Sequence, residues 1–119
     1  MDAGNRGRDA ENRACDYLLG KGLTLLRRNY RSRRGEIDLV LRDTDSLVFV
    51  EVRYRRQAGF GSAAESIDRQ KQTRLTACAK QYLHDFPQVA SLSCRFDVVA
   101  IDGPDYSIEW IKDAFGVVE

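Results

Sequence analysis

The sequence contains few of the residues on which several classes of protein depend. Its 119 residues include three cysteines, one histidine and two prolines. The cysteines Cys15, Cys78 and Cys94 are far apart and form no CxxC pair, which argues against a structural zinc site and against a disulfide framework. Because free cysteine is among the most buried residue types, we expect three buried thiols.

Long apolar segments are also missing. No run approaches the roughly 18 consecutive apolar residues of a membrane span, and the N-terminus lacks the apolar run and cleavage-like site of a signal peptide. We therefore expect a cytoplasmic protein that does not enter a membrane.

The amino-acid composition is close to that of typical globular proteins, with 43% hydrophobic and 31% charged residues. The length suits one domain over residues 1–119, in which roughly two thirds of the unfolded surface is buried on folding. The net charge is only +1, but residues 1–56 carry 13 basic and nine acidic side chains. Fifteen of the 19 basic residues are arginine, whose planar guanidinium matches phosphate oxygens. A GC-rich genome would also produce this excess.

The first half of the chain predicts one helix and three strands. Apolar residues recur at helical spacing over residues 9–21, and Gly22 follows where a left-handed cap is expected. Residues 23–30, 36–41 and 47–54 read as strands, and the turn formers at 43–46 predict a hairpin between the last two.

The second half predicts one helix and two strands. Gly59 and Gly61 open a loop expected to be flexible, Asp68 is a plausible N-cap, and the apolar stripe that starts at Leu75 continues to Pro87. Strands are expected at 92–101 and 106–111. The predicted fold is therefore α/β, with a central mixed sheet of about five strands flanked by helices, in the order helix, three strands, helix, two strands.

The most informative stretch contains Asp38 on one predicted strand and Glu51 on the next. Alternate residues of a strand share a face, so Glu51 and Arg53 point one way while Val50 and Val52 point into the core. Adjacent strands would bring the Asp38 and Glu51 carboxylates together, where they repel unless a hard divalent cation lies between them.

Glu11 is a candidate third acid, because it lies on the apolar face of the first predicted helix. A buried ion-pair network of Glu11, Asp38, Glu51 and Arg53 is the alternative explanation. Such networks seldom stabilise a fold, so they require a reason.

These motifs resemble the YraN-like bacterial proteins of the restriction-endonuclease-like superfamily, near the Holliday-junction resolvases. The resemblance covers nearly the whole chain. The matching segments are residues 7–11, 28–30, 35–39, 48–52, 60–61, Lys71 and 95–99.

The resemblance implies a metal-nuclease motif, an Asp followed by Glu-x-Lys on the next strand with a helical Glu as an extra ligand. Asp38, Glu51 and Glu11 would then bind Mg²⁺ or Mn²⁺, with the Val52 carbonyl as a further donor. Arg53 departs from the pattern, because arginine stays charged and cannot act as a base. In some members of the superfamily the lysine lies on the neighbouring helix, where Lys71 could replace it. The alternative is that Lys71 is an ordinary solvent-facing residue.

Basic side chains near these acids would attract nucleic acid, and Tyr30 would stack on bases. The candidates are Arg27, Arg28, Arg31, Arg33, Arg34, Arg55 and Arg56. A charged edge strand that resists aggregation would look the same. Arg95 and Asp97 share a strand face and are interpreted as a structural pair, and His84 as a surface residue.

The predicted function is hydrolysis of phosphodiester bonds in nucleic acid, with DNA favoured over RNA and with structure-specific DNA a candidate substrate. A catalytically weak or inert nucleic-acid-binding or assembly module is the alternative, favoured by Arg53, and a scaffold for a protein partner is a third. A homodimer is an expectation of the resemblance alone.

Overall fold

Two helices and five strands make up the main elements of the chain. The computed structural model describes residues 3–56 and 64–117. The elements are α1 (Ala3–Gly20), β1 (Thr24–Ser32), β2 (Gly35–Asp43), β3 (Ser46–Arg55), α2 (Arg69–Asp85), β4 (Ser93–Asp102) and β5 (Ser107–Phe115), with short 3₁₀ turns η1 (Ala64–Ser66) and η2 (Pro87–Val89). The predicted fold class and element order are confirmed. The predicted loop at Gly59 and Gly61 lies outside the described residues.

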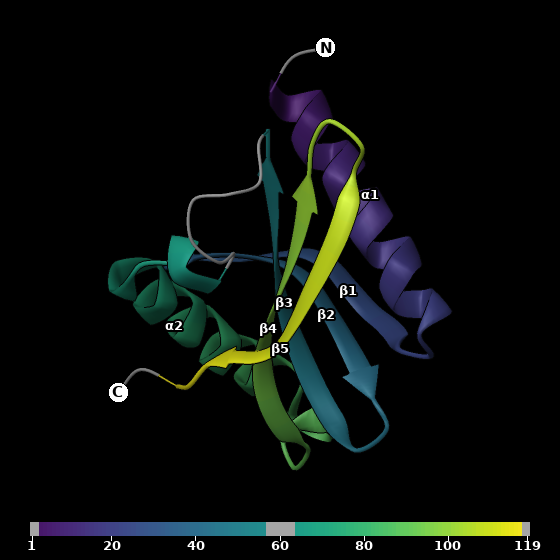
Figure 1. Cartoon of the computed structure of the whole chain (residues 1–119). Coiled ribbons are helices and arrows are strands. Elements are labelled where there is room, and N and C mark those ends of the chain that lie inside the picture. The colour runs from purple at the N-terminus through teal and green to yellow at the C-terminus, as the bar shows by residue number, and fades with distance from the viewer. Residues whose placement is uncertain (1–2, 57–63, 118–119) are drawn as a thin grey trace.

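The five strands form one mixed sheet in the order β1-β2-β3-β4-β5. The β3 and β4 strands run parallel, and the other neighbouring pairs are antiparallel. A parallel pair needs a long crossover, which here contains α2. Figure 1 shows α1 and α2 on opposite sides of the sheet, so the fold has three layers.

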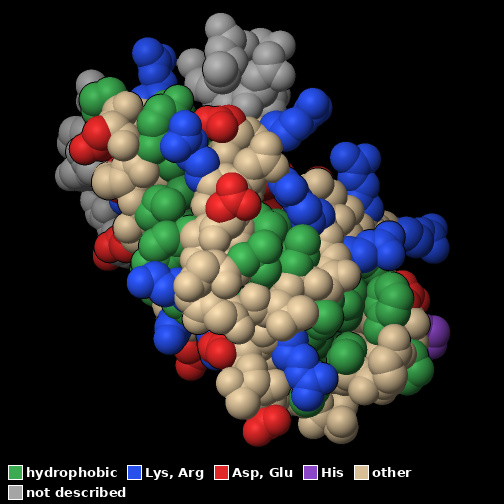
Figure 2. Space-filling model, turned by 90° about the vertical axis from the view of Figure 1, so that its right-hand side faces the viewer, with side chains coloured by type: hydrophobic (Ala, Val, Ile, Leu, Met, Phe, Trp, Pro, Cys, Tyr) green, Lys and Arg blue, Asp and Glu red, His purple; other side chains and the backbone are tan. Residues whose placement is uncertain are grey.

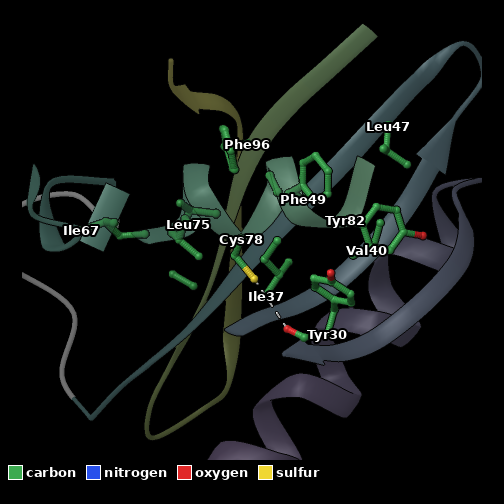
Figure 3. Close-up of a cluster of buried hydrophobic side chains, with 13 residues drawn as sticks. Tyr30, Ile37, Val40, Leu47, Phe49, Ile67, Leu75, Cys78, Tyr82 and Phe96 are labelled. Carbon is green, nitrogen blue, oxygen red and sulfur yellow. Dashed lines mark hydrogen bonds between the residues drawn. The ribbon is translucent and has the colours of Figure 1, made fainter. Parts of the chain in front are cut away.

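The α2 layer covers one half of the core (Figure 3). The Asp68 carboxylate caps this helix by accepting a hydrogen bond from the Lys71 amide at 2.8 Å, as predicted. The predicted apolar stripe packs on Tyr30, Ile37 and Phe49 of the strands. The helix ends at Asp85, before Pro87, because proline has no N–H to continue it.

The α1 layer covers the other half. Ala10, Ala14, Cys15 and Leu18 pack on alternate residues of β2, β3 and β4. Both faces of β3 are therefore buried near its start, with Val48 and Val50 toward α1 and Phe49 toward α2. Gly22 has a φ of +96°, the left-handed conformation expected after the helix.

Two expectations need correction. Cys94 is exposed, because it lies at the start of β4 where the strand emerges from the core, whereas Cys15 and Cys78 are buried as predicted. The last strand continues to Phe115, four residues beyond the predicted end. The Phe115 ring stacks on the Phe96 ring, with 4.9 Å between the ring centroids, and this tertiary contact extends the strand.

No helix in the described ranges is long and apolar enough to cross a membrane.

Candidate metal and nucleic-acid site

The sheet forks between β2 and β3 at Asp38. The two strands pair from Asp43↔Ser46 to Leu39↔Val50, and there the pairing ends. Beyond this point Ile37 pairs only with β1, while Glu51 pairs with β4. The Val52 N–H therefore has no backbone acceptor on β2, and the Asp38 carboxylate accepts its hydrogen bond at 2.9 Å. The fork thus fixes Asp38 against the backbone of β3.

Asp38 and Glu51 come together at this fork, as the strand pattern predicted. Burial first, and then the neighbouring Glu51 charge, raise the pKa of Asp38 to about 8, although the hydrogen bond from the Val52 N–H acts in the opposite direction. At neutral pH the Asp38 carboxyl therefore keeps its proton more readily than an ordinary aspartate does, unless a cation replaces the proton.

Glu51 has an incompletely satisfied carboxylate. Its side chain is buried, and Oε2 accepts no hydrogen bond from the described part of the chain. Lys71 Nζ lies 3.5 Å from this oxygen, an ion pair without hydrogen-bond geometry. Lys71 is therefore placed beside the acids by the first turn of α2, rather than pointing only to solvent.

Arg53 lies on the same face of β3 as Glu51, as predicted. Its Nη2 donates to the Ser66 carbonyl at 3.1 Å, and its buried Nε has no hydrogen-bond partner among the described residues. This bond ties the guanidinium to η1.

Glu11 approaches the pair from α1. Burial and the Asp38 charge raise its pKa, which the neighbouring Arg28 partly offsets. The Arg28 guanidinium is 3.6 Å from Glu11 and donates to Asn12 at 2.8 Å. The acids therefore gather from α1, β2 and β3.

Sequence reasoning missed two residues of this cluster, Asn29 and Glu36. With its nitrogen facing the two carboxylates, the Asn29 amide donates to Glu36 Oε1 at 2.9 Å and to Glu11 Oε1 at 3.0 Å. Asn29 adopts a φ of +53°, which asparagine tolerates better than most residues. The Glu36 charge also contributes to the raised pKa of Asp38. The sequence feature that could have predicted this role is the position of Asn29, which lies within the arginine-rich segment and just before the strand that carries Glu36 and Asp38.

The acids do not form a ready-made metal cage. In the described ranges, no three His, Cys, Asp or Glu side chains are grouped so that they could hold one ion together. Asp38 and Glu51 form the inner pair, and Glu11 is an electrostatic neighbour of Asp38. In a strand, the N–H and C=O of one residue point to the same side. Because the Val52 N–H points toward Asp38, the Val52 carbonyl also points toward the β2 side of the strand.

The candidate nucleic-acid contacts divide into two groups. Five side chains are exposed and lie on β1, on the turn after it or at the end of β3: Arg27, Arg31, Arg33, Arg34 and Arg56. Arg28 belongs to the acid cluster instead.

Two of these expectations are wrong. Tyr30 cannot stack on bases, because its ring is buried against Tyr82 and Phe86 and its hydroxyl donates to Asp85 at 2.6 Å. Arg55 is not a free phosphate ligand, because it donates two hydrogen bonds to the buried Asp102 carboxylate.

Comparison with known proteins gives a consistent result. The profile of the uncharacterised protein family UPF0102 matches residues 10–101. A UPF0102 protein of Pseudomonas entomophila is 51% identical over 112 residues, which cover 92% of this chain and 91% of that protein. A relative from Nitrosococcus oceani is 50% identical over 116 residues, 95% of this chain and 93% of that protein. The chain belongs to the uncharacterised family UPF0102, in agreement with the YraN-like resemblance that its motifs indicated.

Proposed function

We propose that the protein is a divalent-metal-dependent nuclease whose centre is the Asp38 and Glu51 pair. The observation that carries this proposal is the pair itself. Two carboxylates are held together at a fork in the sheet, and one Glu51 oxygen has no hydrogen bond from the described residues. Burying two like charges is costly, and a cation between them offsets the cost.

The donor set fits Mg²⁺ or Mn²⁺. All the candidate ligands are oxygen atoms, which these hard cations prefer. Magnesium keeps several waters and commonly uses only one or two carboxylates. Asp38 and Glu51 would hold the ion, the Val52 carbonyl would be a further donor, and Glu11 would act from the outer side of the site. A closed cage of three acids is therefore not required.

The bound ion would neutralise charge on the scissile phosphate and favour ionisation of an attacking water. The chain's own cations would complete the site. Lys71, 3.5 Å from Glu51 Oε2, would orient a water and hold or release a proton. Arg53 stays protonated, so its role would be a fixed positive charge near the phosphate.

A nucleic-acid-binding module without efficient chemistry is the second candidate. The observation that favours it is the bond from Arg53 to the Ser66 carbonyl, which directs part of the guanidinium away from the acids. Such a module would bind through its exposed arginines and would not need the metal.

A substrate panel separates the two candidates. Labelled flaps, junctions, single strands and duplexes are incubated with Mg²⁺, Mn²⁺ or chelator, using the parent, Asp38→Asn and Asp45→Asn. Asp45 is an exposed turn residue, so its variant removes the same charge away from the site. We expect metal-dependent cleavage by the parent and by Asp45→Asn, and none by Asp38→Asn. Binding by all three without cleavage by any would favour the module.

A further inference from the structure

A basic groove lies beside the acid site, between the β1–β2 turn and α2. Its volume is about 770 Å³. The lining includes Arg31 from the end of β1, Arg33 and Arg34 from the turn, and Lys80 and His84 from α2. In Figure 2, several basic side chains (blue) lie along the upper right-hand edge of the molecule, above the histidine (purple), and others are spread over the rest of this face.

The arginines and the lysine of this groove lack close acidic partners, whereas His84 Nδ1 lies 3.6 Å from Asp85. Among the described residues, Arg33, Arg34 and Lys80 have no carboxylate within 4.0 Å, and Arg31 has only a loose contact of 3.8 Å to Glu36. Two arginines elsewhere are held by buried carboxylates, Arg55 by Asp102 and Arg95 by Asp97, and so differ from these groove residues. Uncompensated positive charge around a hollow attracts a polyanion.

One acid does line the groove. The Asp85 carboxylate accepts hydrogen bonds from the Tyr30 hydroxyl at 2.6 Å and from Gln81 at 2.8 Å. These two donors occupy both of its oxygens and hold the charge at the groove wall. The remaining lining is cationic or neutral.

The groove and the acid pair are close enough to contact one nucleic-acid strand. Gly35 ends the turn and Asp38 lies three residues later, a span of at most ~10 Å in an extended strand. Along α2, Lys71 and Lys80 are nine residues apart, or about 14 Å at 1.5 Å per residue. A strand held at the acids would therefore reach the groove within a few nucleotides.

We propose that the groove binds an unpaired nucleic-acid segment continuous with the strand held at the acid pair. The proposal rests on the proposed function and narrows its substrate to nucleic acid with a single-stranded arm. A volume of about 770 Å³ lies in the range of pockets that enclose small ligands, which suits a few unpaired nucleotides rather than a whole duplex. The guanidinium planes and the His84 ring offer flat faces for unpaired bases.

Fluorescence anisotropy in chelator tests the groove without any chemistry. The probes are a labelled flap, a single strand and a blunt duplex of one sequence, and the variants are Lys80→Glu and the control Lys21→Glu. Both lysines are exposed, so both variants should fold, which circular dichroism checks. We expect Lys80→Glu to weaken binding of the flap and the single strand by about tenfold or more, and Lys21→Glu to change it less than about twofold.

Two results would contradict the proposal that the groove binds an unpaired segment. One is equal binding by Lys80→Glu and Lys21→Glu, and the other is a parent that binds the duplex as tightly as the flap. Because no metal is present, neither result depends on catalysis. A parent that prefers the flap but never cleaves it would count against the nuclease and leave the groove in place.

Discussion

Asp38 lies where its charge costs most, because burial and Glu51 both raise its pKa. Folding raises this pKa from an ordinary value of 3.8 to about 8, so the folded state holds the proton more tightly. The contribution of Asp38 to the free energy of unfolding therefore falls as the pH rises from about 4 to 8, and stays low above that range. A metal ion would restore it, since the ion replaces the proton.

Asp38→Asn should consequently be more stable than the parent at pH 8.5 in chelator. The amide keeps an acceptor for the Val52 N–H and imitates the protonated acid. One pKa unit is about 1.4 kcal/mol, so we expect a gain of roughly 2 kcal/mol or more, and little gain near pH 4. Urea unfolding at both pH values measures it. Adding Mn²⁺ should stabilise the parent and not the variant. If the variant is less stable than the parent at pH 8.5, other groups in the protein already offset the repulsion between Asp38 and Glu51.

Asn29 combines a strained backbone with a bridging amide, and two variants separate these roles. Asn29→Gly keeps the left-handed backbone and removes the hydrogen bonds to Glu11 and Glu36. Asn29→Ala removes the same bonds and adds backbone strain of about 1 kcal/mol. We expect both variants to bind Mn²⁺ more weakly, because the amide holds the Glu11 charge beside the inner pair, with Asn29→Ala the less stable. Calorimetric titration with Mn²⁺ is the measurement, and parent-like affinity of Asn29→Gly would assign Asn29 a backbone role only.

Position 53 separates an enzyme from a binding module. If Arg53 serves as a fixed positive charge, Arg53→Lys should preserve or raise metal-dependent cleavage, and Arg53→Ala should lower it by about ten- to a thousandfold. Single-turnover cleavage with Mn²⁺ measures both, with nucleic-acid affinity as the control. Absence of cleavage in the parent and in Arg53→Lys, with binding intact, would end the enzyme hypothesis.

At the scale of elements, one buried carboxylate adds side-chain hydrogen bonds to the backbone pairing between β4 and β5. Asp97 is fully buried and accepts hydrogen bonds from Arg95, from Trp110 Nε1 at 2.9 Å and from the Asp113 amide at 2.9 Å. The pairing of Arg95 with Asp97 is confirmed, and it explains how the sheet tolerates the irregular register between Phe96 and Val98.

Asp97→Ala should destabilise the protein by about 3 kcal/mol, because it leaves the Trp110 and Asp113 N–H donors without an acceptor and leaves the Arg95 guanidinium with Asp43 as its remaining carboxylate. Asp105→Ala, in the exposed turn before β5, should cost little. Trp110 is the only tryptophan, so its fluorescence in a urea titration reports on this region directly. A loss below about 1 kcal/mol would mean that solvent reaches these donors.

The elements themselves were predictable because their signals are local. The Asp68 cap, the stripe from Leu75 to Phe86 and the alternation around Val48 and Phe49 each depend on neighbours within a few residues. The proximity of Asp38 and Glu51 followed from the same alternation and a short hairpin.

The rest depends on contacts between distant segments. Strand alternation does not reveal the fork that turns Asp38 toward Val52, and aromatic content does not reveal that Tyr30 is buried under α2. Arg55 was misassigned for the same reason, since its partner Asp102 is 47 residues away. Charged and aromatic residues are ambiguous in sequence because one side chain can serve a core or a surface.

Across the whole molecule, the charges are separated. Acids gather at the fork between the two helices, and the exposed arginines and Lys80 lie at the turn and on α2 beside them. Such a layout suits a ligand that carries negative charge along its length and needs a cation at one point. A ligand with a single charge would use only one of the two regions.

This layout predicts a steep dependence of binding on salt, because each phosphate contact releases condensed counterions. For single strands the slope of log K against log salt is about −0.7 per contact, so Arg31→Ala/Arg33→Ala/Arg34→Ala should flatten the slope by about 2. The control, Lys21→Ala/Arg42→Ala/Lys112→Ala, removes three exposed charges elsewhere and should keep the parental slope. Anisotropy titrations from low to moderate salt give both slopes. If the two triple variants flatten the slope equally, the attraction is a property of net charge, and the turn has no special part in holding the strand.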